Sequence, residues 1–228
     1  MQLVLKNIEK SFGRQSVLKG GHYTFEEGKI YGLLGRNGAG KTTLFNILYG
    51  DVASDTGSIT LADEQGLHPL DHNDVGMLFS EPLLPEYLTG YEFTRFMDVH
   101  GLGASQAGNE LEQMAFSRSD QDKFIKDYST GMKAKLSLMS LMLEKPKILL
   151  LDEPLTSLDV IMASTIKQLL KDYKQGHILI FSTHVMEVAR DLCEEIVLLR
   201  SGKISPFTAH GNFEEELIAH LTEVNINE

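Results

Sequence analysis

The chain has 228 residues, and its 32 acidic and 21 basic side chains give a formal net charge of −11. With 42% apolar and 23% charged residues, the composition is that of a globular protein with a packed core and excludes a disordered chain. Apolar runs such as residues 148–151 are far shorter than the roughly 20 residues of a membrane-spanning helix, so no span is expected. The acidic balance argues against a broad nucleic-acid surface, which requires clustered Lys and Arg.

The first residues and the single cysteine favour a cytosolic protein. The start of the chain lacks the basic segment, apolar run and cleavage site of a secretory signal, so none is expected. Cys193 has no second cysteine with which to form an internal disulfide, and no metal-type cluster of Cys and His is present in the sequence. Cys193 is therefore interpreted as a buried structural thiol.

Strand-like and helical segments alternate along most of the chain. Strands are predicted at residues 3–8, 23–27, 30–34, 57–62, 75–79, 148–151, 177–181 and 196–199, with a helix at residues 41–49. Alternating strands and helices predict a mainly parallel core sheet flanked by helices, and hence an α/β fold. The early strands follow one another after short turns and predict an antiparallel β addition.

Residues 82–127 show no strand pattern. Helices are predicted at residues 91–100, 109–116 and 121–127, separated by glycines. We therefore expect a single domain over residues 1–228, with an α/β core formed by residues 1–81 and 128–228 and an inserted helical subdomain at residues 82–127.

The last stretch, residues 205–228, has five Glu and no Lys or Arg. Its apolar residues Phe213, Leu217, Ile218 and Leu221 have helical spacing. This pattern favours a docked amphipathic helix over a regulatory tail.

A glycine-rich segment lies between the predicted strand at 30–34 and the predicted helix at 41–49. Its pattern, G-x-x-x-x-G-K-T, in this context identifies a P-loop. Its glycines let backbone N–H groups point inward at the start of the helix and form a nest for phosphate. Lys41 adds a charge for the β- and γ-phosphates, and the Thr42 hydroxyl is a ligand for Mg²⁺. The predicted nucleotide-binding residues are Gly35, Arg36, Asn37, Gly38, Ala39, Gly40, Lys41, Thr42 and Thr43.

Two acids and a histidine follow predicted strands. Asp152 and Glu153 come after the strand at 148–151, and neighbouring side chains of a strand point to opposite faces, so different roles are expected for them. One is expected to hold Mg²⁺ and the other to orient and deprotonate an attacking water. His184 follows the strand at 177–181, where an imidazole could bond a γ-phosphate or its water.

This ordered set of motifs resembles the nucleotide-binding subunit of ABC transporters over nearly the whole chain. Tyr128-Ser-Thr-Gly-Met132 resembles the family signature L-S-G-G-Q, and Ser129 lies 23 residues before Asp152. Ser129 is predicted to cap a helix at residues 132–143, where its hydroxyl and the free N–H groups form a second anion site. The resemblance implies that this site, Gly131 included, faces the γ-phosphate held by a second subunit. Two subunits would then pair head to tail around two ATP molecules.

The resemblance also implies roles for single residues. Glu153 would be the general base of an ATPase, Asp152 the Mg²⁺ ligand and His184 the contact to the γ-phosphate, with Lys41 acting in catalysis. Phe12 lies where the family places an aromatic ring that stacks on adenine. Ser157-Leu-Asp159 resembles the D-loop, which carries signals across the dimer.

Two positions depart from the family pattern. Ser80 replaces a Gln that touches Mg²⁺ and the attacking water, and its shorter hydroxyl reaches the metal through water. Thr130 replaces the first glycine of the signature, whereas Gly131 is kept. Because the base and the P-loop lysine remain, we expect ATP hydrolysis.

The resemblance implies that the chain binds and hydrolyses ATP with Mg²⁺ and drives a separate membrane permease from the inner face of the cell membrane. The phrase Glu81-Pro-Leu-Leu84 and the short C-terminal stretch resemble exporters of the type-2 group. Two alternatives remain open. One is a poorly hydrolysing half of a heterodimer, motivated by Ser80 and Thr130. The other is a soluble ABC ATPase of ribosomes or DNA, against which the single P-loop, the lack of heptads and the acidic charge argue.

Overall fold

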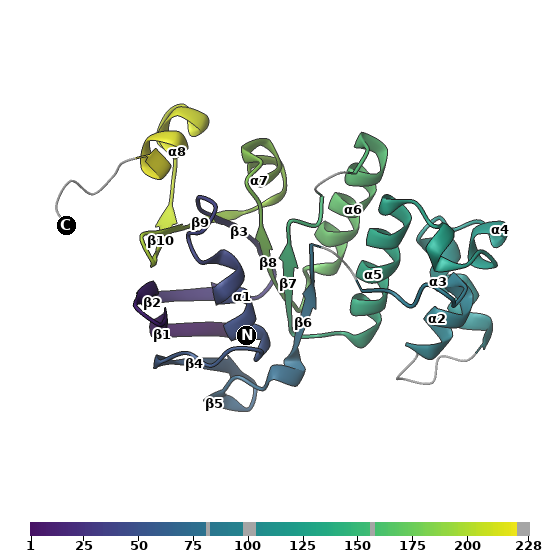
Figure 1. The fold of residues 1–228 in the computed structure, drawn as a ribbon, viewed down its shortest axis with the longest axis horizontal. Coiled ribbons are helices and arrows are strands. Elements are labelled where there is room, and N and C mark those ends of the chain that lie inside the picture. The colour runs from purple at the N-terminus through teal and green to yellow at the C-terminus, as the bar shows by residue number, and fades with distance from the viewer. Residues whose placement is uncertain (81–82, 98–103, 156–157, 223–228) are drawn as a thin grey trace.

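The main sheet places the glycine-rich segment after one of its middle strands. The structure is a computed structural model that describes residues 1–80, 83–97, 104–155 and 158–222 (Figure 1). Within these ranges a six-stranded sheet has the order β10-β9-β3-β8-β7-β6, and all neighbours are parallel except β9 and β10. Its strands are β3 (Ile30–Leu34), β6 (Val75–Leu78), β7 (Ile148–Asp152), β8 (Ile178–Ser182), β9 (Glu195–Arg200) and β10 (Lys203–Phe207).

Both faces of this sheet are covered, which explains the continuous apolar runs of its strands. On one face Tyr31 and Leu33 pack with helix α1 (Lys41–Tyr49) and with the second sheet. On the other face Ile30 packs with side chains of three further helices. These helices are α5 (Thr130–Glu144), α6 (Val160–Tyr173) and α7 (Met186–Leu192). The prediction of a mainly parallel sheet flanked by helices is confirmed.

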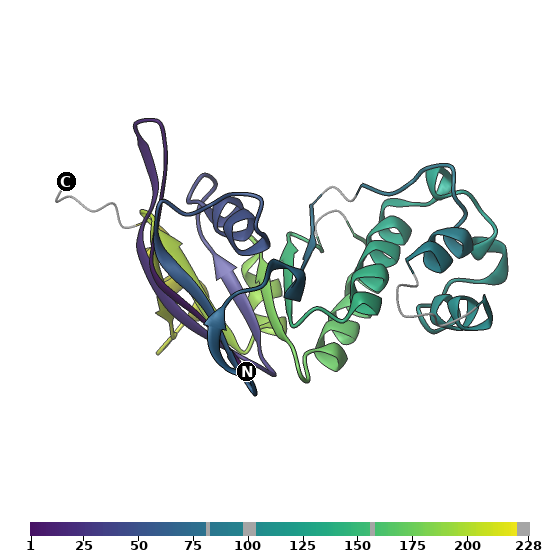
Figure 2. The same cartoon turned by 90° about the horizontal axis from the view of Figure 1, so that it is seen from below.

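The predicted antiparallel addition is a second sheet with the order β2-β1-β4-β5. Its strands are β1 (Gln2–Phe12), β2 (Gln15–Glu26), β4 (Thr56–Asp63) and β5 (Gly66–Pro69). Strands β1 and β2 extend beyond their predicted ends as a hairpin that projects past the body of the molecule (Figure 2). The hairpin end is mostly exposed, so apolar periodicity marked only the buried parts of the two strands.

The helical region lies at one end of the molecule and packs on α5 (Figures 1 and 2). It contains α2 (Gly90–Phe96), α3 (Ala104–Gln113), α4 (Arg118–Gln121) and the 3₁₀ turn Ile125–Asp127. Outside this region, a second 3₁₀ turn, His72–Asp74, precedes β6. The predicted helix at 121–127 is wrong. Ser117 and Asp120 form a reciprocal capping box that starts α4 earlier, and this helix ends at Gln121. Residues 98–100 of the predicted first helix lie outside the described residues.

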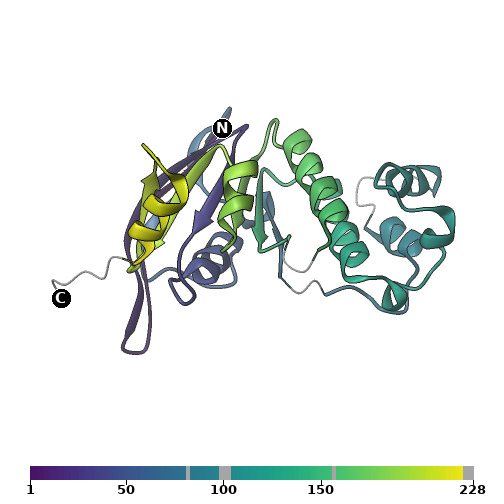
Figure 3. The ribbon, with the colours of Figure 1, turned by 90° about the horizontal axis from the view of Figure 1, so that it is seen from above.

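The C-terminal stretch forms α8 (Phe213–Thr222), which lies beside β9 and β10 at the end opposite the helical region (Figure 3). Leu217 is fully buried against side chains such as Leu34 and Leu198, so the predicted docked amphipathic helix is confirmed. The Arg200 guanidinium donates to the His220 carbonyl oxygen at 2.9 Å and satisfies one of the free carbonyls at the end of α8. Among the helices described, none has the length and apolar character needed to cross a membrane.

Cys193 follows α7, and a side chain built on Gly32 of β3 would approach its sulfur to 3.0 Å. Burial raises the pKa of the Cys193 thiol to about 12, so the thiolate is not populated near neutral pH. Cys193 is partly rather than fully buried, and its packing and raised pKa agree with the predicted structural role.

Candidate active site

The glycine-rich segment turns sharply between β3 and α1. Gly40, which precedes the first residue of α1, has φ +104°, a left-handed conformation that favours glycine. A Cβ on Gly35 would lie 2.5 Å from the Leu199 carbonyl oxygen, so the loop also needs glycine to pass close to β9. The backbone therefore turns sharply and leaves the first N–H groups of α1 open at its N-terminus, where an anion is stabilised.

Lys41 is buried within this loop. Its Nζ donates to the Gly35 carbonyl oxygen at 2.8 Å. Desolvation lowers the pKa of Lys41, and the nearby carboxylates of Glu153 and Asp152 oppose that shift. The Gly35 carbonyl is a neutral partner for the Lys41 ammonium. Because a buried charge is more stable beside an opposite charge, an anion in this loop would stabilise Lys41 further. The loop therefore has the charge and the donors that fit a phosphate chain.

Asp152 lies at the carboxyl end of β7, between two hydroxyl groups. Ser182 Oγ donates to Asp152 Oδ1 at 2.5 Å, and Thr42 Oγ1 faces Asp152 Oδ2 at 3.4 Å. A hydroxyl and a carboxylate are hard oxygen donors of the kind that Mg²⁺ takes in phosphate sites. The donor set at Thr42 and Asp152 therefore fits a magnesium ion, and the Ser80 side of the same pocket offers a further hydroxyl.

Glu153 is directed differently from Asp152 because its backbone has φ +52°, an uncommon value for a residue other than glycine. Its N–H donates to the Ser182 carbonyl oxygen at 3.2 Å, and its Oε2 lies 2.7 Å from His184 Nδ1. Thr183 shapes the turn that carries His184, since its Oγ1 accepts a hydrogen bond from the Val185 N–H at 3.0 Å. The turn after β7 and the turn after β8 thus bring an acid and an imidazole together.

Most of the predicted residues line one pocket of about 510 Å³. Its lining consists of Val17, Asn37, Gly38, Gly40, Lys41, Thr42, Thr43, Ser80, Asp152 and Glu153. Val17 was missed by sequence reasoning, because an aliphatic residue in a strand carries no sign that it lies against a phosphate loop. It does so because a Cβ on Gly40 would meet Val17 Cγ1 at 2.9 Å.

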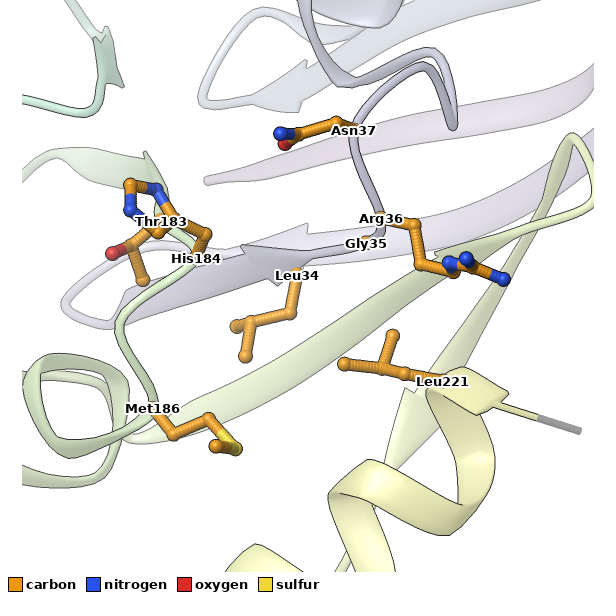
Figure 4. Close-up of a pocket in the computed structure, with 8 residues that line it drawn as sticks. All are labelled: Leu34, Gly35, Arg36, Asn37, Thr183, His184, Met186 and Leu221. Carbon is orange, nitrogen blue, oxygen red and sulfur yellow. The ribbon is translucent and has the colours of Figure 1, made fainter.

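A second pocket of about 410 Å³ adjoins the glycine-rich loop and shares Asn37 with the first. Figure 4 shows Thr183 and His184 on one side of this space, Arg36 turned away from them, and Leu221 of α8 at its edge. The C-terminal helix therefore borders the loop that carries Gly35 and Arg36.

Four of the predicted residues line neither pocket: Ala39 of the glycine-rich loop itself, Phe12, Ser129 and Gly131. Phe12 is 51% exposed near the tip of the β1–β2 hairpin, where Lys10 Nζ lies 5.4 Å from its ring centroid. Ser129 caps α5, as predicted, by accepting the Met132 N–H at 3.2 Å, and Gly131 follows in the first turn of that helix. A Cβ on Gly131 would lie 3.2 Å from Met162 Cγ, so this glycine also allows α5 to pack on α6.

The remaining motif residues are only partly described. Ser157 of the D-loop-like segment and Glu81 lie outside the described residues. Asp159 caps α6 by accepting the Met162 N–H at 2.9 Å, a local role that its resemblance to a D-loop did not predict.

Comparisons with known proteins agree with this geometry. A family model described as ABC transporter matches residues 18–156. The uncharacterized ABC transporter ATP-binding protein YdbJ of Bacillus subtilis is 32% identical, over 89% of this chain and 67% of that protein. The Nod factor export ATP-binding protein I of Burkholderia lata is also 32% identical, over 96% of this chain and 75% of that protein. A solved ATP-binding subunit of an ABC transporter has the same fold, with a TM-score of 0.85, 24% identity, and coverage of 98% of this chain and 100% of that one.

Proposed function

This chain belongs to the ABC transporter family as an ATP-binding subunit with ATPase activity, and from that premise we propose that it powers export through a separate membrane permease. The observation that carries the site assignment is the single pocket lined by Lys41, Thr42, Asp152 and Glu153. It joins a phosphate nest, a buried cation, a pair of metal-type oxygen donors and a carboxylate that can accept a proton.

The phosphate chain of ATP is bound by the N–H groups at the start of α1 and by Lys41. An ammonium has three donors, so Lys41 can keep the Gly35 carbonyl while it also donates to phosphate oxygens. Each charge-assisted hydrogen bond of this kind contributes about 1.5–3 kcal/mol. The buried position of Lys41 strengthens these contacts because the surrounding dielectric is lower than that of water.

Thr42 and Asp152 are assigned to Mg²⁺, with Ser80 reaching it through water. When bound, Mg²⁺ neutralises charge on the β- and γ-phosphate oxygens. The protein prepares this site by holding Asp152 Oδ2 beside the Thr42 hydroxyl.

Glu153 is assigned as the general base. It takes a proton from a water whose oxygen attacks the γ-phosphorus, while the bond from that phosphorus to the bridging oxygen breaks and ADP leaves. His184 Nδ1 holds Glu153 Oε2 at 2.7 Å and so restricts the direction of the carboxylate. The exposed side of the imidazole remains available to the γ-phosphate.

A second ATP-binding subunit is part of the proposal. Ser129 and Gly131 line neither pocket of their own chain, although the start of α5 has the capped geometry of an anion site. A head-to-tail pair would bring this helix end to the phosphate loop of the other subunit. Phe12, at the hairpin tip, is proposed to stack on the adenine of its own nucleotide.

The helical region is proposed as the face that docks on the permease, which would hold the chain at the inner face of the cell membrane. Large apolar side chains are exposed at its edge, with Leu83 at 99%, Tyr87 at 77% and Phe96 at 79%. Exposed apolar residues gathered on one region indicate an interaction surface. Export is supported by the similarity to a protein named for Nod factor export.

The test is recovery of the tagged chain from detergent-solubilised membranes of its source cell, followed by phosphate-release assays on the recovered complex. We expect a polytopic membrane protein in the eluate and turnover that Glu153→Gln removes. Equal inactivity of wild type and Glu153→Gln with the permease present would contradict hydrolysis by this subunit. Recovery of ribosomal or DNA-repair proteins without a membrane protein would contradict the role in transport.

The open alternative is a poorly hydrolysing half of a heterodimer. Two observations favour this alternative. Ser80 lines the pocket where the family pattern has the longer Gln, and Thr130, which replaces the first glycine of the signature, begins α5. Light scattering on Glu153→Gln protein with ATP separates the two cases. A homodimer supports the full ATPase, whereas dimer formation only after addition of a related subunit supports the heterodimer.

A further inference from the structure

Ser182 contacts both acids of the candidate site, although no motif of the sequence assigns it a role. It is the last residue of β8 and has no exposed surface. Its hydroxyl donates to Asp152 Oδ1 at 2.5 Å, and its carbonyl oxygen accepts the Glu153 N–H at 3.2 Å. The parallel register of β7 and β8 pairs Asp152 with Ser182 directly, so the sheet itself sets these contacts.

The hydroxyl contact determines which oxygen of Asp152 faces the P-loop helix. With Oδ1 bonded to Ser182, Oδ2 is the oxygen that faces Thr42 Oγ1 at 3.4 Å. The terminal torsion of an aspartate is broad and roughly two-fold, so an unrestrained carboxylate would sample other directions. A hydrogen bond from a fully buried neighbour removes that freedom.

Ser182 is the only polar residue of β8. The other residues of the strand, Ile178 to Phe181, are apolar and fully buried. A buried hydroxyl is stable only with a hydrogen-bond partner, and here that partner is the carboxylate of Asp152. An alanine at this position would fill the strand end without the cost of burying a polar group.

We infer that Ser182 is a positioning residue for the Mg²⁺ site, one that holds Asp152 with Oδ2 toward Thr42 so that the oxygen donors are arranged before the metal and nucleotide bind. This inference rests on the proposed function. Groups that orient a metal-ligating side chain typically change metal affinity about 10–100-fold when they are removed.

The experiment uses the full chain and a fluorescent ATP analogue. Binding is measured in EDTA and then across a Mg²⁺ titration for wild type, Ser182→Ala and the matched control Ser140→Ala. Ser140 is also a buried serine, but its hydroxyl donates to the Ser137 carbonyl oxygen within α5. We expect Ser182→Ala to raise the Mg²⁺ midpoint about 10-fold or more while affinity in EDTA stays within about 2-fold of wild type. Ser140→Ala is expected to leave both values unchanged.

Thermal melts show whether each variant folds, and Ser182→Cys replaces Ser182→Ala if the alanine variant does not. A thiol keeps the shape of the side chain, although sulfur is larger than oxygen, and it is a weak donor, so the midpoint is expected to shift in the same direction. A wild-type midpoint in a folded Ser182 variant overturns the inference, as does an equal loss of affinity in EDTA and in Mg²⁺. Wild-type binding that does not respond to Mg²⁺ would instead contradict the proposed function.

Discussion

Glu153 and His184 lie 31 residues apart in the sequence, yet Glu153 Oε2 and His184 Nδ1 are separated by 2.7 Å. The pairing of β7 with β8 places both residues at one edge of the sheet, and the left-handed turn at Glu153 directs its side chain to the imidazole. The acid assigned as general base is therefore held by a residue from the neighbouring strand end.

Replacing His184 removes the partner that restricts the Glu153 carboxylate. We expect His184→Ala to lower the rate of phosphate release about 100-fold, at the lower end of what a positioned general base contributes. ATP affinity should fall much less than turnover, because Lys41 and the phosphate loop keep their own contacts when the imidazole is lost. Phosphate release and binding of a fluorescent ATP analogue measure the two effects.

His210→Ala is the control, since the His210 side chain is exposed and far along the chain from both motifs. Equal losses in both variants would contradict the assignment.

Glu153→Gln keeps the size of the side chain but removes its ability to take a proton. We expect turnover to fall about 100- to 10,000-fold while ATP still binds. Because the bound nucleotide is then not cleaved, an ATP-dependent dimer should accumulate, which size-exclusion chromatography with light scattering detects. Turnover near the wild-type rate would show that another group accepts the proton.

Lys41 is expected to strengthen ATP binding while it lowers the thermal stability of the folded protein. Burial lowers the pKa of Lys41, which means that the folded protein disfavours its charge. Lys41→Met keeps a long side chain without that charge, so the melting temperature should stay the same or rise. ATP affinity should fall at least about 10-fold, because one charge-assisted contact is worth about 1.5–3 kcal/mol. Unchanged affinity in a titration would show that the ammonium does not contact the phosphates.

The packing of α8 is testable with two neighbouring residues. Leu217 is fully buried, whereas Ile218 is 47% exposed. We expect Leu217→Ala to lower the free energy of unfolding by about 2–5 kcal/mol, because it leaves a cavity against β9 and β10. Ile218→Ala should cost less than about 1 kcal/mol, in proportion to its smaller loss of buried area. Urea denaturation measures both, and equal costs would indicate that α8 is not docked in solution.

Local chemistry explains what could be predicted from the sequence. The helix predicted at residues 41–49 matches α1 because a phosphate nest must be followed at once by a helix N-terminus. The buried parallel strands were also found, since their apolar runs are continuous. Strands β5 and β10 were missed, because β5 is largely exposed and β10 combines exposed polar positions with Pro206. Neither has the periodicity on which a strand prediction depends.

The parts of the site that sequence reasoning missed depend on strand register. The P-loop residues and the two acids could be recognised from motifs, and Ser129 was correctly placed as a helix cap. The contact of Ser182 with Asp152 follows from the pairing of these two residues in neighbouring strands, which the sequence alone does not specify. Val17 lines the pocket for a similar reason, because the second sheet packs its strand against the P-loop.

At position 153 the backbone conformation favours glycine, whereas the proposed chemistry requires a carboxylate. A residue other than glycine pays about 1–2 kcal/mol for a left-handed conformation, so Glu153→Gly would relieve the turn after β7. The same replacement would remove the proton acceptor from the pocket. Selection for thermal stability alone would therefore favour glycine at position 153, and the resulting protein would lose the group that accepts the proton in ATP hydrolysis.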